Sequence, residues 1–70
     1  MSTRETVHAA LIGLLRARGM SALDAKAVAD SKLDEAVARV EPLIKNQRSL
    51  NDWATACGNL HAWLTATATQ

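Results

Sequence analysis

A corner between two helices decides the fold of this chain: residues 14–24 read LLRARGMSALD. Gly19 supplies the left-handed backbone conformation that commonly ends a helix, and Arg16 and Arg18 lie in the turn before it, where cations favour the negative end of the helix dipole. Ser21 can cap a second helix, with the acidic Asp24 in its first turn. The pattern therefore predicts two helices joined by a short turn.

Outward from this corner, capping residues and apolar spacing predict three helices over residues 3–18, 22–40 and 50–64. Because Leu43 and Ile44 keep the phase of the second apolar stripe, we expect a kink at Pro42 and continuation to residue 46 rather than a full stop. The Thr-rich tail, residues 65–70, is expected to fray. No segment alternates like a strand. The expected fold is all-α, a single three-helix domain over residues 1–70.

The composition limits the class of protein. Seventy residues with a net charge of +1 argue against a polybasic nucleic-acid arm, and 49% hydrophobic residues argue against disorder. The apolar runs are too short for a membrane span, and no segment reads as a signal peptide. Cys57 is the only cysteine, which excludes an internal disulfide and suits a cytoplasmic protein.

The apolar residues predict self-association. They include 14 Ala and no Phe or Tyr, so a single copy buries little area. Small domains without a disulfide or metal often need to oligomerise, so we expect a homodimer. The expected interface is the long stripe of the second helix, Leu33, Val37, Val40 and Ile44.

The first helix carries a second pattern, a strip of small residues at Ala9, Gly13 and Ala17. A mid-helix Gly in solvent costs about 1 kcal/mol relative to Ala, so we expect Gly13 to be packed, most simply against another subunit. The alternative is a solvated face rich in the best helix former.

The candidate chemical groups do not assemble into a catalytic or metal site. Cys57 and His61 lie one helical turn apart, but a zinc site needs three or four protein ligands and His8 is the only other histidine. We expect Cys57 to be a buried thiol and His61 a half-buried imidazole. Asp30 and Asp34 lie on a charged, solvated flank. The sequence predicts no enzyme, no cofactor and no metal.

Residues 14–21 resemble the first helix and turn of helix-turn-helix proteins, with Ala25 and Val28 where the second helix would be apolar. A recognition helix presents Arg, Asn, Gln or Ser to base edges, whereas residues 22–27 read ALDAKA. A small DNA-binding regulator is therefore the alternative function rather than the favoured one.

Partner contacts are expected on the third helix. Trp53 falls within its apolar stripe and is expected in the core, whereas Trp63 lies off the stripe. Trp and Arg are enriched in binding hot spots, so Trp63, with Arg16 and Arg18 from the corner, is the expected partner-binding set. The alternative is that Trp63 seals the edge of the core.

In its short, Ala- and Arg-rich, single-domain and motif-free character, the chain resembles the small accessory proteins of temperate phages, including anti-CRISPR proteins and quorum-sensing anti-activators. The resemblance implies a stoichiometric activity, in which the protein binds a host protein and masks its working surface. Besides an interaction module and a DNA-binding regulator, a third class of function is that of a purely structural subunit in a larger helical assembly.

Overall fold

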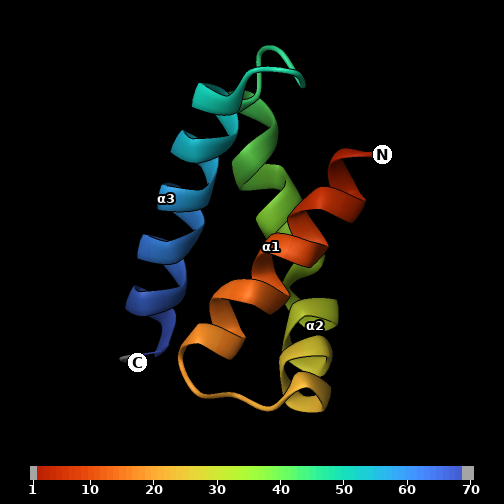
Figure 1. Cartoon of the computed structure of the whole chain (residues 1–70), viewed down its shortest axis with the longest axis vertical. Coiled ribbons are helices and arrows are strands. Elements are labelled where there is room, and N and C mark those ends of the chain that lie inside the picture. The colour runs from red at the N-terminus through yellow and green to blue at the C-terminus, as the bar shows by residue number, and fades with distance from the viewer. Residues whose placement is uncertain (1, 69–70) are drawn as a thin grey trace.

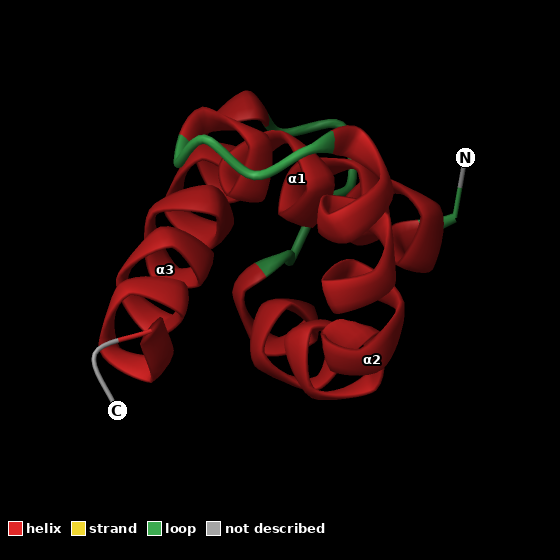
Figure 2. Cartoon of the chain, turned by 90° about the horizontal axis from the view of Figure 1, so that it is seen from below, coloured by secondary structure: helices red, strands yellow, loops and turns green. Residues whose placement is uncertain are grey.

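A computed structural model of the chain describes the backbone of residues 2–68 and the side chains of residues 2–66. It contains helix α1 (Thr3–Ala17), helix α2 (Ala22–Val40), a 3₁₀ turn η1 (Glu41–Leu43) and helix α3 (Leu50–Ala68). Helix α2 runs up behind α1, and α3 returns down one side (Figure 1). Seen along the bundle, α2 and α3 flank the centre while α1 lies across them (Figure 2). The expected all-α, three-helix fold is confirmed.

The corner that the sequence predicts between α1 and α2 is present. The Ser21 hydroxyl caps α2 by accepting a hydrogen bond from the Asp24 amide at 3.2 Å. At the other end of α1, the Ser2 hydroxyl accepts one from the Glu5 amide at 3.2 Å. Gly19 has φ +95°, the left-handed conformation that ends α1. The expected helix 3–18 is one residue longer than α1, and the expected helix 22–40 has the bounds of α2.

The expected continuation of the second helix to residue 46 is wrong. Helix α2 ends at Val40, and η1 adds only one 3₁₀ turn before Ile44 becomes extended, with φ −96° and ψ 93°. The reason is a competing hydrogen-bond acceptor: the Asp52 carboxylate accepts bonds from the Lys45 and Asn46 amides at 3.0 and 2.9 Å. Pro42 fits the first turn of η1, where its missing N–H costs nothing.

Helix α3 corrects a second expectation, because it extends four residues beyond the expected end at residue 64 and stays helical to Ala68. The Thr65 hydroxyl donates to the His61 carbonyl at 2.9 Å. The Arg18 guanidinium donates to the Leu64 carbonyl at 3.2 Å and also to the Thr65 hydroxyl. These bonds hold the helix at Leu64 and Thr65, where the expected tail begins. Residues 69–70 lie outside the described part of the chain.

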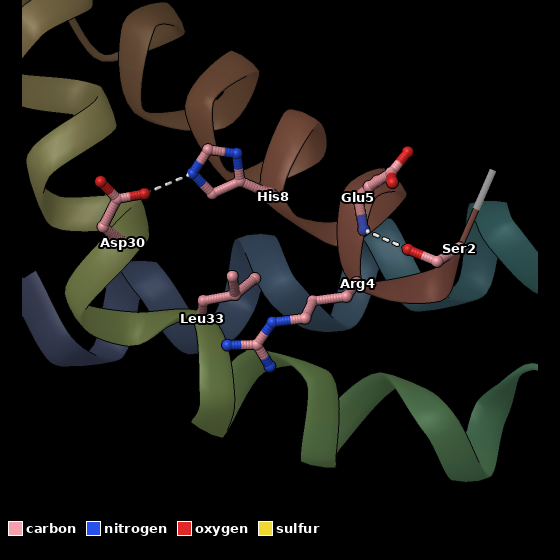
Figure 3. Close-up of a pocket in the computed structure, with 6 residues that line it drawn as sticks. All are labelled: Ser2, Arg4, Glu5, His8, Asp30 and Leu33. Carbon is pink, nitrogen blue, oxygen red and sulfur yellow. Dashed lines mark hydrogen bonds and ion pairs between the residues drawn. The ribbon is translucent and has the colours of Figure 1, made fainter.

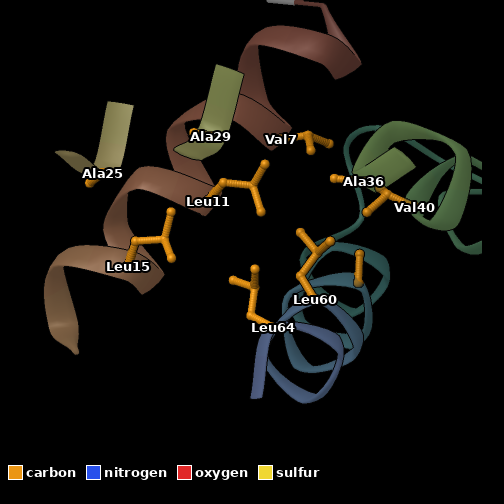
Figure 4. Packing of buried hydrophobic residues seen from close by; sticks show 10 residues of the cluster. Val7, Leu11, Leu15, Ala25, Ala29, Ala36, Val40, Leu60 and Leu64 are labelled. Atoms are coloured by element: carbon orange, nitrogen blue, oxygen red, sulfur yellow. The ribbon is translucent and has the colours of Figure 1, made fainter. Parts of the chain in front are cut away.

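The core lies between the three helices and contains few large side chains (Figure 4). Its largest fully buried side chains are Leu11, Leu60, Val7 and Val40. Three alanines of α2 belong to the same buried cluster: Ala25, Ala29 and Ala36. Val40, expected at a dimer interface, is instead 0% exposed within the chain's own core. Leu33, Val37 and Ile44 pack half-buried against that core, so the stripe of α2 is largely used within one copy.

Candidate functional site

The orientation of α3 about its own axis determines which residues reach the surface. Ala56, Leu60 and Leu64 are buried, whereas Cys57 and His61 are exposed. The expectation of a buried thiol and a half-buried imidazole is therefore wrong. At 100° per residue, the buried arc is rotated by about 60° from the expected stripe. The expected stripe left out Ala56 and included Leu50, which is 85% exposed. Its members were Leu50, Trp53, Ala54, Cys57, Leu60, His61 and Leu64.

This rotation brings Trp63 to the seam between α3 and α2. The side chain is half-buried and packs against the core. The guanidinium carbon of Arg39 lies 5.0 Å from the centroid of the indole ring, and the Lys32 ammonium lies 5.5 Å from it. Both distances are within the range of cation–π attraction. Trp63 thus seals the core edge, as the alternative predicted, and also forms a cationic surface with Lys32 and Arg39.

Lys32 was not predicted as a neighbour of Trp63, and Arg39 was only one of five basic residues considered as possible charged neighbours, with Arg16, Arg18, Lys45 and Arg48. Lys32 and Arg39 are seven residues apart, so they lie on the same face of α2 two turns apart. That spacing is visible in the sequence, but the packing of α2 against α3 is not. Arg39 also lies 3.9 Å from Glu35, the (i, i+4) partner on its own helix. We call Lys32, Arg39 and Trp63 the indole–cation surface.

Arg18 and Arg16 have different environments. Arg18 joins the corner after α1 to the end of α3 through Leu64 and Thr65, next in sequence to Trp63. Its guanidinium is engaged by α3, so its first role is to hold that helix. Arg16 is exposed in the last turn of α1. The corner after α1 therefore lies against the end of α3, close in sequence to Trp63. The cations near the indole ring come from α2 instead.

Trp53 also differs from its expected place in the core. It is half-buried, and its indole Nε1 donates to the Gln47 carbonyl at 2.8 Å. The Gln47 side chain in turn donates to the Thr3 hydroxyl at 2.6 Å. Trp53 therefore ties the loop before α3 to the start of α1, which is a structural role.

A shallow groove of about 350 Å³ lies between α1 and α2 and is lined by Ser2, Arg4, Glu5, His8, Asp30 and Leu33 (Figure 3). His8 Nε2 lies 2.6 Å from Asp30 Oδ1, and the Lys26 ammonium donates to Asp30 Oδ2 at 2.9 Å. Lys26, and then His8, lower the pKa of the Asp30 carboxyl below its usual 3.8.

The polar groups of this groove hold the helices together. The Arg4 guanidinium donates to Asp34 at 2.7 Å, and His8 spans to Asp30, so both pairs link α1 to α2. Nucleophilic catalysis would need a hydroxyl within reach of His8. The Ser2 hydroxyl is engaged by the Glu5 amide, and Figure 3 shows it at the far end of the groove from His8. The groove is best explained by two contacts that link the helices, the Arg4–Asp34 ion pair and the His8–Asp30 hydrogen bond.

The described residues show no arrangement that supports metal binding or DNA binding. The described residues contain no group of three or more His, Cys, Asp or Glu side chains placed to hold a metal ion. In the helix that would read DNA, Leu23 is 79% exposed, Asp24 is exposed, and Lys26 is paired with Asp30. An acidic residue and a bulky apolar residue at the start of this helix are poor partners for phosphates.

The solvent side of α3 is a second surface, one that the sequence interpretation missed. We call it the α3 outer face and define it by six exposed residues: Ala54, Cys57, Gly58, His61, Ala62 and Thr65. Helix α2 carries seven Lys, Arg, Asp or Glu residues, whereas residues 53–70 contain none. The absence of charged residues over 53–70 could have indicated this surface from the sequence. An analysis of hydrophobic periodicity does not detect it.

Comparison with known proteins gives no relative: the chain matches no protein-family model, no curated protein and no solved structure. The function must therefore be argued from the surfaces described above. None of the described helices combines the length and apolar character that a membrane span requires.

Proposed function

We propose that this chain is a non-catalytic protein–protein interaction module that binds a host regulatory protein and masks its surface, in the manner of small temperate-phage inhibitors. The observation that carries the proposal is the indole–cation surface at the seam of α2 and α3. Trp63 is half-buried there, with the Arg39 guanidinium 5.0 Å and the Lys32 ammonium 5.5 Å from its ring.

The chemistry of this surface resembles that of binding hot spots. Trp and Arg are the residue types most enriched there, because a rigid ring and a planar cation give large contact area at low entropic cost. The core edge fixes the indole, so its exposed part is already oriented before a partner arrives. Such preorganisation lowers the cost of association.

The charges indicate the kind of partner. Two cations flank the ring, and Glu35 lies beside Arg39 at 3.9 Å. A partner surface with a carboxylate for Lys32 and an apolar side chain for the indole would match both features. The expected partner is therefore an acidic, partly apolar protein surface, and electrostatic complementarity would favour its approach.

The test is affinity capture from a lysate of the native host, with the bound proteins identified by mass spectrometry. The test variant is Lys32→Glu with Arg39→Glu, which reverses both cations. The matched control is Lys45→Glu with Arg48→Glu, because these two basic residues are exposed in the segment between α2 and α3 and change the net charge equally. Circular dichroism confirms that each variant is folded.

Wild type and the control should capture one host protein at near-equal stoichiometry, and the reversed variant should lose it by at least about tenfold, or 1.4 kcal/mol. Equal capture by both variants would refute the role of this surface. Recovery of DNA, with affinity falling steeply as salt is raised, would instead support the helix-turn-helix alternative.

A further inference from the structure

The corner after α1 has a fixed backbone, and Arg18 lies within it. The Gly19 amide donates to the Arg16 carbonyl at 2.9 Å. The Met20 amide donates to the Leu15 carbonyl at 3.3 Å. With Gly19 at φ +95°, these two bonds form the Schellman arrangement that ends a helix. The base of the Arg18 side chain is therefore held in place by the backbone hydrogen bonds around it.

From this fixed base, the Arg18 side chain reaches across to α3. Its Nη1 donates to the Leu64 carbonyl at 3.2 Å, and its Nη2 donates to the Thr65 hydroxyl. The Thr65 hydroxyl donates in turn to the His61 carbonyl at 2.9 Å, so this acceptor is itself oriented. Because the guanidinium is planar and rigid, two bonds to adjacent residues restrain both the position and the rotation of that turn of α3.

The turn that Arg18 holds also carries Trp63, the residue before Leu64. Leu64 is 3% exposed and lies in the core, whereas the Trp63 ring packs at the core edge. The Arg39 guanidinium carbon is 5.0 Å from the centroid of that ring, and the Lys32 ammonium is 5.5 Å from it. Cation–π attraction requires the cation to lie over the ring within about 6 Å, so the position of this turn decides whether the surface forms.

The start of α3 is held by other groups, far from Trp63. The Asp52 carboxylate accepts two amides of the preceding loop, and the Trp53 indole donates to the Gln47 carbonyl at 2.8 Å. Trp63 follows Trp53 by ten residues, which is about 15 Å along the helix axis. A small tilt of α3 about its start therefore moves the ring by a larger distance, and the bonds from Arg18 oppose that tilt.

We propose that Arg18 is a positioning residue for the indole–cation surface. It holds the last turns of α3 against the corner and so places the Trp63 ring against Lys32 and Arg39. The inference rests on the proposed function for its consequence, because that surface is the one a host protein would bind. It also separates the two corner arginines, since Arg18 acts through Trp63 whereas Arg16 is exposed in the last turn of α1.

The test is nuclear magnetic resonance of the full chain, because the ring current of an indole shifts protons over its face upfield. Side-chain protons of Lys32 and Arg39 should show this shift in wild type. Arg18→Met keeps an unbranched stem and removes the donors, so these resonances should move toward the values of a solvated side chain. Amide exchange of residues 63–66 should become at least about fivefold faster, the effect of losing one hydrogen bond. Arg16→Met is the matched control, because it removes the same charge two residues away and should change neither readout.

A further control separates positioning from a general loss of stability. Val7 is 0% exposed in the core part of α1, so Val7→Ala lowers stability and leaves Arg18 in place. Its folded state should keep the ring-current shifts. Arg18→Lys should restore them only in part, because an ammonium is a donor without the planar fork. Unchanged shifts in Arg18→Met, or an equal loss of shifts in Val7→Ala, would overturn the proposal.

Capture of the host protein reports separately on the proposed function. Arg18→Met should capture less host protein than wild type although Lys32 and Arg39 are intact, and Arg16→Met should capture as much as wild type. If wild type captures no host protein, the proposed function fails, and the ring-current shifts still decide the role of Arg18. Loss of the shifts with unchanged capture would overturn the link between the position of the ring and binding.

Discussion

Gly13→Ala should stabilise the fold, opposite to what a packed glycine would give. The sequence favours a packed Gly13, but it is exposed in the middle of α1 and an added Cβ would meet nothing within 4 Å. No side chain of the same chain has to move to accept a methyl group. The expected effect is therefore the difference in helix propensity alone, about 0.8–1.0 kcal/mol in favour of Ala.

The expected shift in melting temperature follows from this free energy and the unfolding entropy, which scales with chain length. Unfolding entropy is about 2.1 cal/mol/K per residue, which over 70 residues gives about 0.15 kcal/mol/K. A gain near 0.9 kcal/mol should raise the midpoint by about 6 °C. Thermal unfolding followed by circular dichroism at low micromolar protein would measure it.

Ala9→Gly is the matched control, because Ala9 is exposed one turn earlier on the same helix. It should lower the midpoint by a similar amount for the same reason. A fall in midpoint for Gly13→Ala, with the control behaving as expected, would refute the reasoning. That result would mean that something packs against Gly13, as the sequence-based expectation of a second subunit on α1 requires.

Three other substitutions test the core, the end of α3 and the loss of stability at low pH. Leu11→Ala should cost about 3–5 kcal/mol, a large part of the 4–10 kcal/mol that about 70 residues provide, and urea unfolding would show it. Arg18→Met should cost about 1 kcal/mol and speed amide exchange in the last turns of α3, because the donor to the Leu64 carbonyl is lost. Asp30 has a folded pKa below 3.8, so its ionised form contributes stability above that pH, and the contribution is lost as pH falls through the folded pKa. Asp30→Asn should therefore show a shallower decline in melting temperature than wild type between pH 5 and pH 2.5, taken as about one unit either side of the unfolded value.

Local signals in the sequence were sufficient for both ends of α1 and for the start of α2. Ser2, Ser21 and Gly19 act through backbone geometry within four residues of themselves, so the sequence contains all the information needed to place these helix ends. The break near Pro42 was also visible. Its outcome was not, because the Asp52 carboxylate that captures the Lys45 and Asn46 amides comes from the following helix.

The site depended on tertiary packing and was only partly predictable. Trp63 was chosen because it lies off the expected stripe, but that stripe was misplaced and the ring packs against the edge of the core. Its neighbours Lys32 and Arg39 depend on how α2 lies against α3. The phase of α3 was misjudged because its stripe contains small residues on every side. Ala54, Ala56 and Cys57 are nearly equivalent by hydropathy, and only packing decides that Ala56 is the buried one.

The indole–cation surface depends on which side of α3 faces the core, and the reactivity of the Cys57 thiol measures that orientation directly. The thiol is exposed and lies one residue from the fully packed Ala56. In native protein at low micromolar concentration, an aromatic disulfide reagent should modify Cys57 completely and about as fast as in the unfolded chain. Ala56→Cys combined with Cys57→Ser should react only as fast as the protein unfolds. Protection of Cys57, with rapid reaction at position 56, would contradict the orientation of α3 and the indole–cation surface built on it.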